Sequence, residues 1–230
     1  MNKEEKYRNE IKYCCSEMEL QLLESRIRHL CRLDSHVGST CRYSISSIYF
    51  DDHKNTYYYE NENGTDPRQK FRIRMYDHDR SYLVLECKKK KSGMTLKQSC
   101  PLTEEEYHRI MQGGIMADTD REKPLLFRFL TLQNMHLLQP KVIVNYERVP
   151  YIYEPGNVRI TFDRNISSSA DFDNFGNPEL KKRPIMPVGK HILEIKYDEF
   201  LPDYLYNVLQ IPNLTRTNFS KYYLCRKYSM

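Results

Sequence analysis

The chain has 230 residues, with 36 Lys and Arg against 31 Asp and Glu, and a formal net charge of +5. This length can bury a real core, and 29% charged with 40% hydrophobic residues indicates a globular rather than a disordered chain. No apolar run approaches the roughly 18 to 20 residues of a membrane span, which excludes an integral membrane protein. The first residues lack the apolar stretch of a secretory signal, and seven cysteines without a Cys-x-x-Cys pair predict a reducing, cytoplasmic location.

The first half of the chain predicts one helix followed by strands. Ser16 and Glu19 form a capping box with leucines at helical spacing behind it, so we expect a helix at about 16–33. The segment at about 42–61 predicts two strands joined by a turn near 52–55. Further strands, separated by short turns, are expected at about 68–77, 81–90 and 94–100.

The second half predicts two helices, a hairpin and a further strand. A capping box of Thr103 and Glu106 starts a helix that ends at Gly113, and another helix covers about 123–138. Glu154-Pro-Gly-Asn157 is a hairpin signal. The other elements are strands at about 141–153, 157–165 and 190–199, a polar loop at 167–188, a short helix from 202 and a last helix at about 217–228. No linker or repeat interrupts this pattern, so we expect one domain.

The most informative pattern is the alternation of charge along the strands. From Arg68 to Arg74 every even position is basic, while Phe71 and Ile73 occupy odd positions. Side chains alternate between faces with period two, so four cations share one face of this strand. Five further strands carry a charged face, marked by the pairs Glu10/Lys12, Glu86/Lys88, Tyr146/Arg148, Arg159/Asp163 and Glu194/Lys196.

Two architectures fit such strands. One is an open sheet with one face exposed to solvent and helices packed on the other face. The other is a closed antiparallel barrel with a polar lumen and helices packed on its outside. The barrel gives the charged faces a common task, because crowded cations need an anion with many oxygens. Interspersed Glu and Asp would orient the cations or hold a divalent metal. Phosphate chains bound as metal complexes meet this demand, whereas a nucleic-acid duplex prefers an exposed basic surface.

Eight short motifs occur in order along nearly the whole chain. They are Arg8-x-Glu10-x-Lys12-Tyr13, Ser47-Ile-Tyr-Phe-Asp51, Arg68-x-Lys70-x-Arg72-x-Arg74, Glu86-x-Lys88, Tyr146-x-Arg148, Arg159-x-Thr161-x-Asp163, Glu194-x-Lys196-Tyr197 and Phe219-Ser220-Lys221-Tyr222. Each is weak alone, but together they resemble the VTC domain. That domain is the catalytic part of the vacuolar transporter chaperone complex and of bacterial polyphosphate polymerase-like proteins, within the triphosphate tunnel metalloenzymes, or CYTH-like group.

The resemblance implies an α+β fold, an eight-stranded antiparallel β-barrel tunnel with a polar basic lumen and helices packed on the outside. It implies a single domain over residues 1–230, and we expect neither the SPX domain nor the membrane spans of the yeast-type proteins. The implied activity is ATP-dependent polyphosphate synthesis, in which the γ-phosphoryl group of ATP passes to a growing chain with the help of Mn²⁺ or Mg²⁺.

The resemblance also implies roles for individual residues. Catalytic contacts to the triphosphate and the product chain fall to Lys12, Arg72, Arg74, Lys88, Arg148, Arg159 and Lys221, with Glu194 as the metal ligand. Substrate-binding positions are Glu10, Arg68, Lys70, Glu86, Lys97, Tyr146, Asp163, Lys196 and Ser220. Tyr146 would stack on adenine, and Ser220 would assist Lys221. Eleven of these residues are basic and four are acidic, which gives the predicted lumen a surplus of seven positive charges.

Two other functions stay open, a metal-dependent triphosphatase or nucleotide-phosphate hydrolase in the same tunnel and a non-catalytic polyphosphate-binding subunit. Tunnel triphosphatases typically open with Glu-x-Glu-x-Lys, and Arg8 replaces the first of those carboxylates here, which favours phosphate-chain handling over hydrolysis. Retention of Glu194 argues against a dead binding module. We expect ATP and polyphosphate as ligands, no nucleic acid and no direct membrane insertion. A separate membrane-protein partner at the inner face of a membrane is left open.

Overall fold

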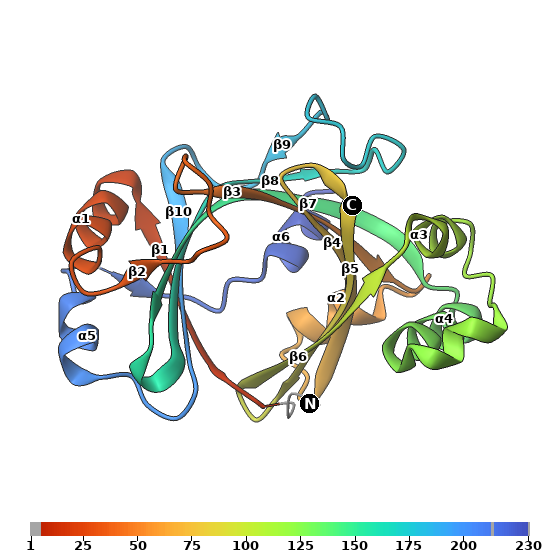
Figure 1. Ribbon diagram of the computed structural model, residues 1–230, viewed down its shortest axis with the longest axis horizontal. Helices are drawn as coiled ribbons and strands as arrows, with labels where there is room; N and C mark the ends of the chain where they lie inside the picture. The colour runs from red at the N-terminus through yellow and green to blue at the C-terminus, as the bar shows by residue number, and fades with distance from the viewer. Residues whose placement is uncertain (1–5, 213, 230) are drawn as a thin grey trace.

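The computed structural model describes residues 6–212 and 214–229, which form a large antiparallel sheet with six α-helices (Figure 1). The strands are β1 (Asn9–Ser16), β2 (Arg32–Leu33), β3 (Tyr43–Asp51), β4 (Arg68–Tyr76), β5 (Asp79–Lys91), β6 (Met94–Leu102), β7 (Gln139–Tyr153), β8 (Val158–Ser169), β9 (Arg183–Pro184), β10 (Lys190–Tyr197) and β11 (Thr215–Arg216). The helices are α1 (Glu17–Ile27), α2 (Thr56–Glu62), α3 (Glu104–Met111), α4 (Pro124–His136), α5 (Asp203–Val208) and α6 (Lys221–Lys227), with 3-10 turns at Asp118–Glu122 and Pro155–Asn157.

The sheet is not the closed eight-stranded barrel that the sequence predicted. Eight strands of eight residues or more follow the order β1-β10-β8-β7-β3-β4-β5-β6, and three two-residue strands, β2, β9 and β11, bring the described sheet to eleven. Within the described residues, the backbones of β1 and β6 meet at one bridge, where Arg8 and Thr95 exchange two hydrogen bonds of 2.9 Å. Closure stops there because segment 215–217 occupies the rest of that edge, with the Thr217 N–H donating to the Lys12 carbonyl at 2.9 Å.

The outer face of the arc is apolar and covered by helices, as alternation along the strands requires. On one side α3 and α4 pack over β3 to β6, with Phe129 against Phe50 and Phe71 at ring-centroid distances of 5.0 and 5.2 Å. On the other side α1 and α5 pack over β1, β8 and β10, where Leu20 and Leu23 are fully buried. Figure 1 shows the two helix pairs at opposite ends of the arc.

One helix lies on the inner face, which corrects the expectation that all helices pack outside. Tyr222 of α6 is fully buried and stacks on Tyr49 of β3 at 5.1 Å between ring centroids. Cys225 of the same helix belongs to an apolar cluster with Val142 and Val144 of β7. Figure 1 shows α6 within the arc. Part of the inner face is therefore a third apolar core, and the remainder is left for charged side chains.

The tyrosines at 57–59 form helix α2 rather than the predicted second strand. The carboxylate of Asp51 accepts hydrogen bonds from the N–H groups of Tyr57 and Tyr58 at 2.9 and 3.0 Å. The first amide groups of a helix have no partner within it, so a carboxylate at this place favours helix over strand. Asp51 also accepts a hydrogen bond of 2.5 Å from the hydroxyl of Tyr222. One buried carboxylate thus joins β3, α2 and α6.

Two predicted helices are shorter in the structure. Helix α1 ends at Ile27 instead of residue 33, because the chain turns after Arg28 and Leu33 enters β2, which pairs with β7. Helix α6 begins at Lys221 instead of residue 217, because Ser220 is its N-cap and accepts a hydrogen bond from the Tyr223 N–H. In both cases backbone pairing to a strand replaces the turns that apolar spacing alone predicts.

None of the helices in the described part of the chain combines the length and the apolar character needed to cross a membrane. The longest, α4, has 13 residues, against about 20 for a bilayer span. The first five residues, part of the segment in which we expect no secretory signal, lie outside the described residues.

We expect Asp51→Ala to lower the free energy of unfolding by about 3 kcal/mol or more. The change leaves the amides of Tyr57 and Tyr58 and the hydroxyl of Tyr222 without their acceptor. Urea denaturation measures the loss. Asp173→Ala, at an exposed loop position, is the control and should change stability by less than about 0.5 kcal/mol. A wild-type midpoint for Asp51→Ala would contradict the joining role of this carboxylate.

Candidate functional site

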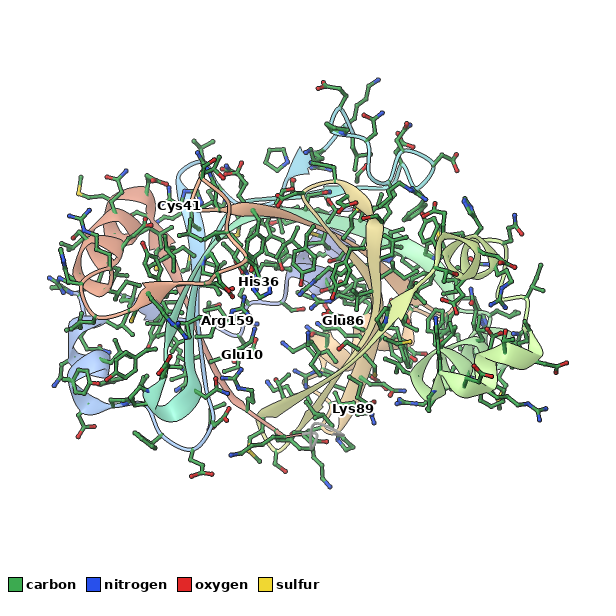
Figure 2. The ribbon with its side chains drawn as sticks, in the orientation of Figure 1. Glu10, His36, Cys41, Glu86, Lys89 and Arg159 are labelled. Atoms are coloured by element: carbon green, nitrogen blue, oxygen red, sulfur yellow. The ribbon has the colours of Figure 1, made fainter. Side chains whose placement is uncertain are left out.

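A cavity of about 700 Å³ occupies the inner side of the arc. Its lining includes the eleven cations that the sequence predicted to face inward, namely Lys12, Arg68, Lys70, Arg72, Arg74, Lys88, Lys97, Arg148, Arg159, Lys196 and Lys221. Glu10, Glu194, Tyr146 and Ser220 line it as well. Glu86 and Asp163 lie behind the lining cations, with side chains 2% and 0% exposed. Figure 2 shows Glu10, Glu86 and Arg159 directed toward the central opening.

The run of four lysines at 88–91 illustrates how alternation selects side chains for the cavity. Lys88 and Lys90 line it, whereas Lys89 and Lys91 are not among the lining residues. Lys89 lies outside the central opening in Figure 2. The run therefore contributes two cations to the interior, and it is not a continuous basic patch.

Glu86 of β5 gathers three cations. Its carboxylate lies 2.6 Å from Arg72 Nη2, 2.9 Å from Lys97 Nζ and 3.6 Å from Arg74 Nη1. Burial would raise the pKa of Glu86, but the charges of Arg72, Arg74 and Lys97 outweigh it and hold the pKa well below its usual range. Glu86 is thus an anion that fixes Arg72 and Arg74 side by side at the cavity wall.

Asp163 of β8 performs the same task for a second group. Arg148 binds it through two parallel hydrogen bonds, Nε–Oδ1 at 2.7 Å and Nη2–Oδ2 at 2.8 Å. Lys221 Nζ lies 2.5 Å from Oδ2 of the same carboxylate. Burial favours the neutral acid, yet Arg148 and Lys221 lower the pKa of Asp163, so the carboxylate is ionised. A helix residue and a strand residue are therefore held together by one fully buried anion.

Glu10 and Glu194 form the third group, around Lys12. Lys12 Nζ lies 2.6 Å from Glu10 and 3.6 Å from Glu194, Lys88 lies 2.7 Å from Glu10, and Lys196 forms an ion pair with Glu194. Burial opposes the charge on each of these carboxylates. The pKa of Glu10 is nevertheless held low by Lys88 and Lys12, and that of Glu194 by Lys196 and Lys12. The pKa of Lys12 is raised despite its own burial, because Glu10 and Glu194 flank it.

A fifth carboxylate, Asp34, was missed by the sequence reasoning. It comes from the loop after β2 and lies 2.7 Å from Arg159 Nη2, while the Tyr43 hydroxyl accepts a hydrogen bond of 3.1 Å from the same nitrogen. Asp34 belongs to no alternating strand, so no pattern in the sequence could place it. Asp34 lowers the surplus of the predicted set from seven positive charges to six, and the cavity lining also includes the cations Lys6, Arg8, Lys90 and Arg216 and the acids Glu62 and Asp66.

Three side chains make contacts that differ from those their implied roles require. The ring of Tyr146 is 4% exposed, and Arg148 and Lys221 lie 5.2 and 4.8 Å from its centroid, so adenine could stack there only if a cation moved. Burial would raise the pKa of Tyr146, but Arg148 and Arg74 lower it. Ser220 accepts a hydrogen bond of 3.2 Å from Lys70 rather than from Lys221. The Arg8 guanidinium turns to Asp198, 2.7 Å away.

The carboxylates also bear on metal binding. Within residues 6–212 and 214–229, no three His, Cys, Asp or Glu side chains gather into a group that could hold a metal ion. Glu194 and Glu10 face the cavity with Lys12 between them. Mg²⁺ is usually held by one or two carboxylates together with substrate phosphates. Glu194 and Glu10 therefore fit a metal ion that enters together with the substrate phosphates and is bound by both the phosphates and Glu194. They do not fit a metal ion that is coordinated by protein side chains alone.

Comparison with known proteins identifies the family of the chain. Residues 7–230 match the model of the VTC domain. The chain belongs to the VTC domain family. No curated protein matches its sequence.

Solved structures resemble the fold. A putative adenylate cyclase from Bacillus halodurans is 14% identical, with a TM-score of 0.52 over 90% of this chain and 87% of that one. A putative adenylyl cyclase from Hippeastrum with a dominant triphosphatase activity is 14% identical, with a TM-score of 0.55 over 97% of each chain. A Pyrococcus horikoshii protein is 16% identical, with a TM-score of 0.52 over 96% of this chain and 99% of that one. At these identities the likeness shows the fold alone, and with the VTC domain it supports a triphosphate tunnel fold.

We expect Asp163→Asn to destabilise this VTC domain by about 3–5 kcal/mol, because it leaves Arg148 buried without its anion. The matched control is Glu147→Gln, which breaks the ion pair with Arg42 on the exposed surface and should cost less than about 1 kcal/mol. Urea denaturation of both variants gives the comparison. Equal losses would mean that the buried pair contributes no more than the surface pair.

Proposed function

We propose that the chain is an ATP-dependent polyphosphate polymerase. The γ-phosphoryl group of ATP passes to the end of a polyphosphate chain inside the cavity. A new bond forms between γ-phosphorus and a terminal chain oxygen, the bond to the β-phosphate oxygen breaks, and ADP leaves with that electron pair. The observation that carries the proposal is the group of eleven cations from seven strands and one helix that line one cavity, anchored by buried carboxylates yet left with surplus positive charge.

The residues suit phosphoryl transfer because this chemistry asks for positioning and charge stabilisation rather than for a protein nucleophile. Arg72 and Arg74, fixed by Glu86, present planar guanidinium groups that can bind two phosphate oxygens each. Lys12 of β1 and Lys88 of β5, which both pair with Glu10, supply point charges. We place the transferred group between these sets, with the product chain running along Arg148 and Lys221.

A divalent metal would be shared between Glu194 and the substrate phosphates, and its chemistry would be to polarise the bridging oxygens when bound. The chain's own contribution at this place is the ionised state of Glu194, maintained by Lys196 and Lys12. Mn²⁺ or Mg²⁺ suits this carboxylate oxygen donor. Lys12 and Lys196 also keep the charge near Glu194 balanced before the metal–phosphate complex enters.

The second candidate is a triphosphatase in the same cavity, which the activity of the Hippeastrum protein favours. Hydrolysis needs a metal-bound water and carboxylates to hold the metal. Strand β1 offers Glu10 alone, because Arg8 occupies the other position and pairs with Asp198. We therefore rank polymerisation above hydrolysis. A non-catalytic polyphosphate-binding subunit remains the third outcome of the assay below. Location in the cytoplasm, absence of nucleic-acid binding and a membrane-protein partner stay predictions.

Pure protein incubated with ATP and Mn²⁺ should form long-chain polyphosphate and ADP. Glu194→Gln should reduce this rate by about 100-fold or more, because the metal–phosphate complex loses its protein ligand. Polymer is measured on gels and free phosphate in solution. Glu179→Gln, at an exposed position, is the control and should match the wild type. Phosphate release without polymer would replace the polymerase by a triphosphatase, and binding without turnover would indicate the binding subunit.

Tripolyphosphate affinity should fall as the pH rises above about 8. Burial lowers the pKa of Lys88 to about 8, with Lys12 adding to the effect and Glu10 opposing it. Phosphate attracts the ammonium form, so loss of this proton weakens binding by up to about tenfold per pH unit. Titration calorimetry across this range measures the slope. Lys88→Arg stays charged and should flatten it; an unchanged slope in this variant would remove Lys88 from the explanation.

A further inference from the structure

A second cavity, of about 510 Å³, lies on the outer side of the sheet. Strands β3, β7 and β8 line one side of this outer cavity, and segment 182–190, which includes β9, lines the other. Figure 1 shows β9 on the outer side of the arc, away from α6. None of the eleven cations of the inner cavity lines it, and Tyr146 is the residue that the two linings share. The outer cavity is therefore a separate place on the molecule.

The sheet is polar under the outer cavity, although it is apolar under the helices. Ser46 of β3 and Asn145 of β7 lie opposite each other, and the Ser46 hydroxyl donates a hydrogen bond of 2.6 Å to Asn145 Oδ1. The two residues are only 4% and 5% exposed. Within residues 6–212 and 214–229, Asn145 Nδ2 has no hydrogen-bond partner. A buried amide group without a partner is costly, so an acceptor that enters the cavity is bound favourably here.

Two histidines of the lining have open ring nitrogens as well. His191 of β10 is 7% exposed, and its Nε2 lies 2.7 Å from the carboxylate of Glu17 in α1. Its Nδ1 is buried and has no partner among the described residues, and the same holds for Nδ1 of His78 in the turn between β4 and β5. Three separate parts of the chain thus leave hydrogen-bonding atoms unused at one cavity.

Cations and apolar side chains complete the lining. Lys182 and Lys190 are exposed, and in the part of the chain that the structure describes neither forms an ion pair with a carboxylate. The acid of the lining, Glu147, is already paired with Arg42 at 3.1 Å. Segment 184–188 contributes proline, methionine and valine side chains. The outer cavity therefore offers apolar contacts, neutral hydrogen-bonding groups and positive charge together.

We propose that the outer cavity binds a nucleoside phosphate, with the nucleoside between Asn145 and segment 184–188 and the phosphate at Lys182 and Lys190. A base and a ribose supply the acceptors and donors that the amide and the histidines lack, and the flat base suits the apolar wall. The volume lies within the range of small-molecule sites, about 300–1,000 Å³. Inorganic phosphate would leave the amide unsatisfied, and a free nucleoside would leave the lysines unpaired. This site goes beyond the proposed function and does not rest on it.

Calorimetric titration with AMP, adenosine and inorganic phosphate as separate ligands tests the proposal. AMP should bind at one site per chain, at least about tenfold more tightly than either of the other two. Asn145→Leu removes the open amide and should weaken AMP binding about tenfold or more. The double variant Lys182→Met with Lys190→Met should weaken it by a similar factor. Lys181→Met, at the adjacent exposed position outside the lining, is the matched control and should keep the wild-type affinity.

The inner cavity is the competing location for AMP. Lys88→Met, which changes the inner cavity, should leave AMP affinity within about twofold of the wild type. If AMP binding is lost in Lys88→Met and kept in the outer-cavity variants, or if the wild type binds no AMP, the inference is overturned. Neither result bears on polyphosphate synthesis, which the assay with ATP and Mn²⁺ tests independently. Melting curves check folding, and if Asn145→Leu does not fold, the exposed lysine pair decides.

Discussion

Four buried carboxylates, each shared by at least two cations, are the interaction on which the rest of the structure depends. Glu86 and Asp163 lie behind the cavity wall, and Glu10 and Glu194 lie in it. Burying a lone cation would cost several kcal/mol, so strands rich in Arg and Lys could not turn inward without these anions. An equal number of acidic and basic side chains would leave no net positive charge to attract an anionic ligand. Sharing each anion among several cations stabilises the wall and still leaves it positive.

The sheet can accommodate this charged interior because its outer face buries apolar side chains and its inner face buries mostly charged ones. The outer face is apolar and covered by α1, α3, α4 and α5, so the helices supply the hydrophobic stabilisation of folding. The inner face combines the charged cavity with the apolar contacts of α6. Tyr222 of that helix packs against Tyr49. At the start of the helix, Ser220 accepts a hydrogen bond from Lys70, and Lys221 forms an ion pair with Asp163. Packing of one helix therefore positions two polar groups in the cavity.

Much of this arrangement was predictable from alternation along the strands. The period-two pattern places a cation such as Arg72 inside and Phe71 outside without knowledge of the fold, and capping boxes correctly predicted the starts of α1 and α3. Two contacts made by acidic side chains outside this alternation were not predictable. Asp34 reaches Arg159 from a loop, and the carboxylate of Asp51 turns the following tyrosines into a helix. Neither leaves a local pattern.

The incomplete closure of the sheet has a topological consequence. A polymer inside a barrel with a full ladder of hydrogen bonds can enter or leave only along the axis. Here β1 and β6 are joined, within the described backbone, by the two hydrogen bonds of Arg8 and Thr95. A lateral opening would have to break these two bonds, each worth about 1 kcal/mol, together with the ion pair that joins Lys88 of β5 to Glu10 of β1 at 2.7 Å. Within the described residues, this edge is therefore held by far fewer backbone hydrogen bonds than a complete ladder between two strands would supply.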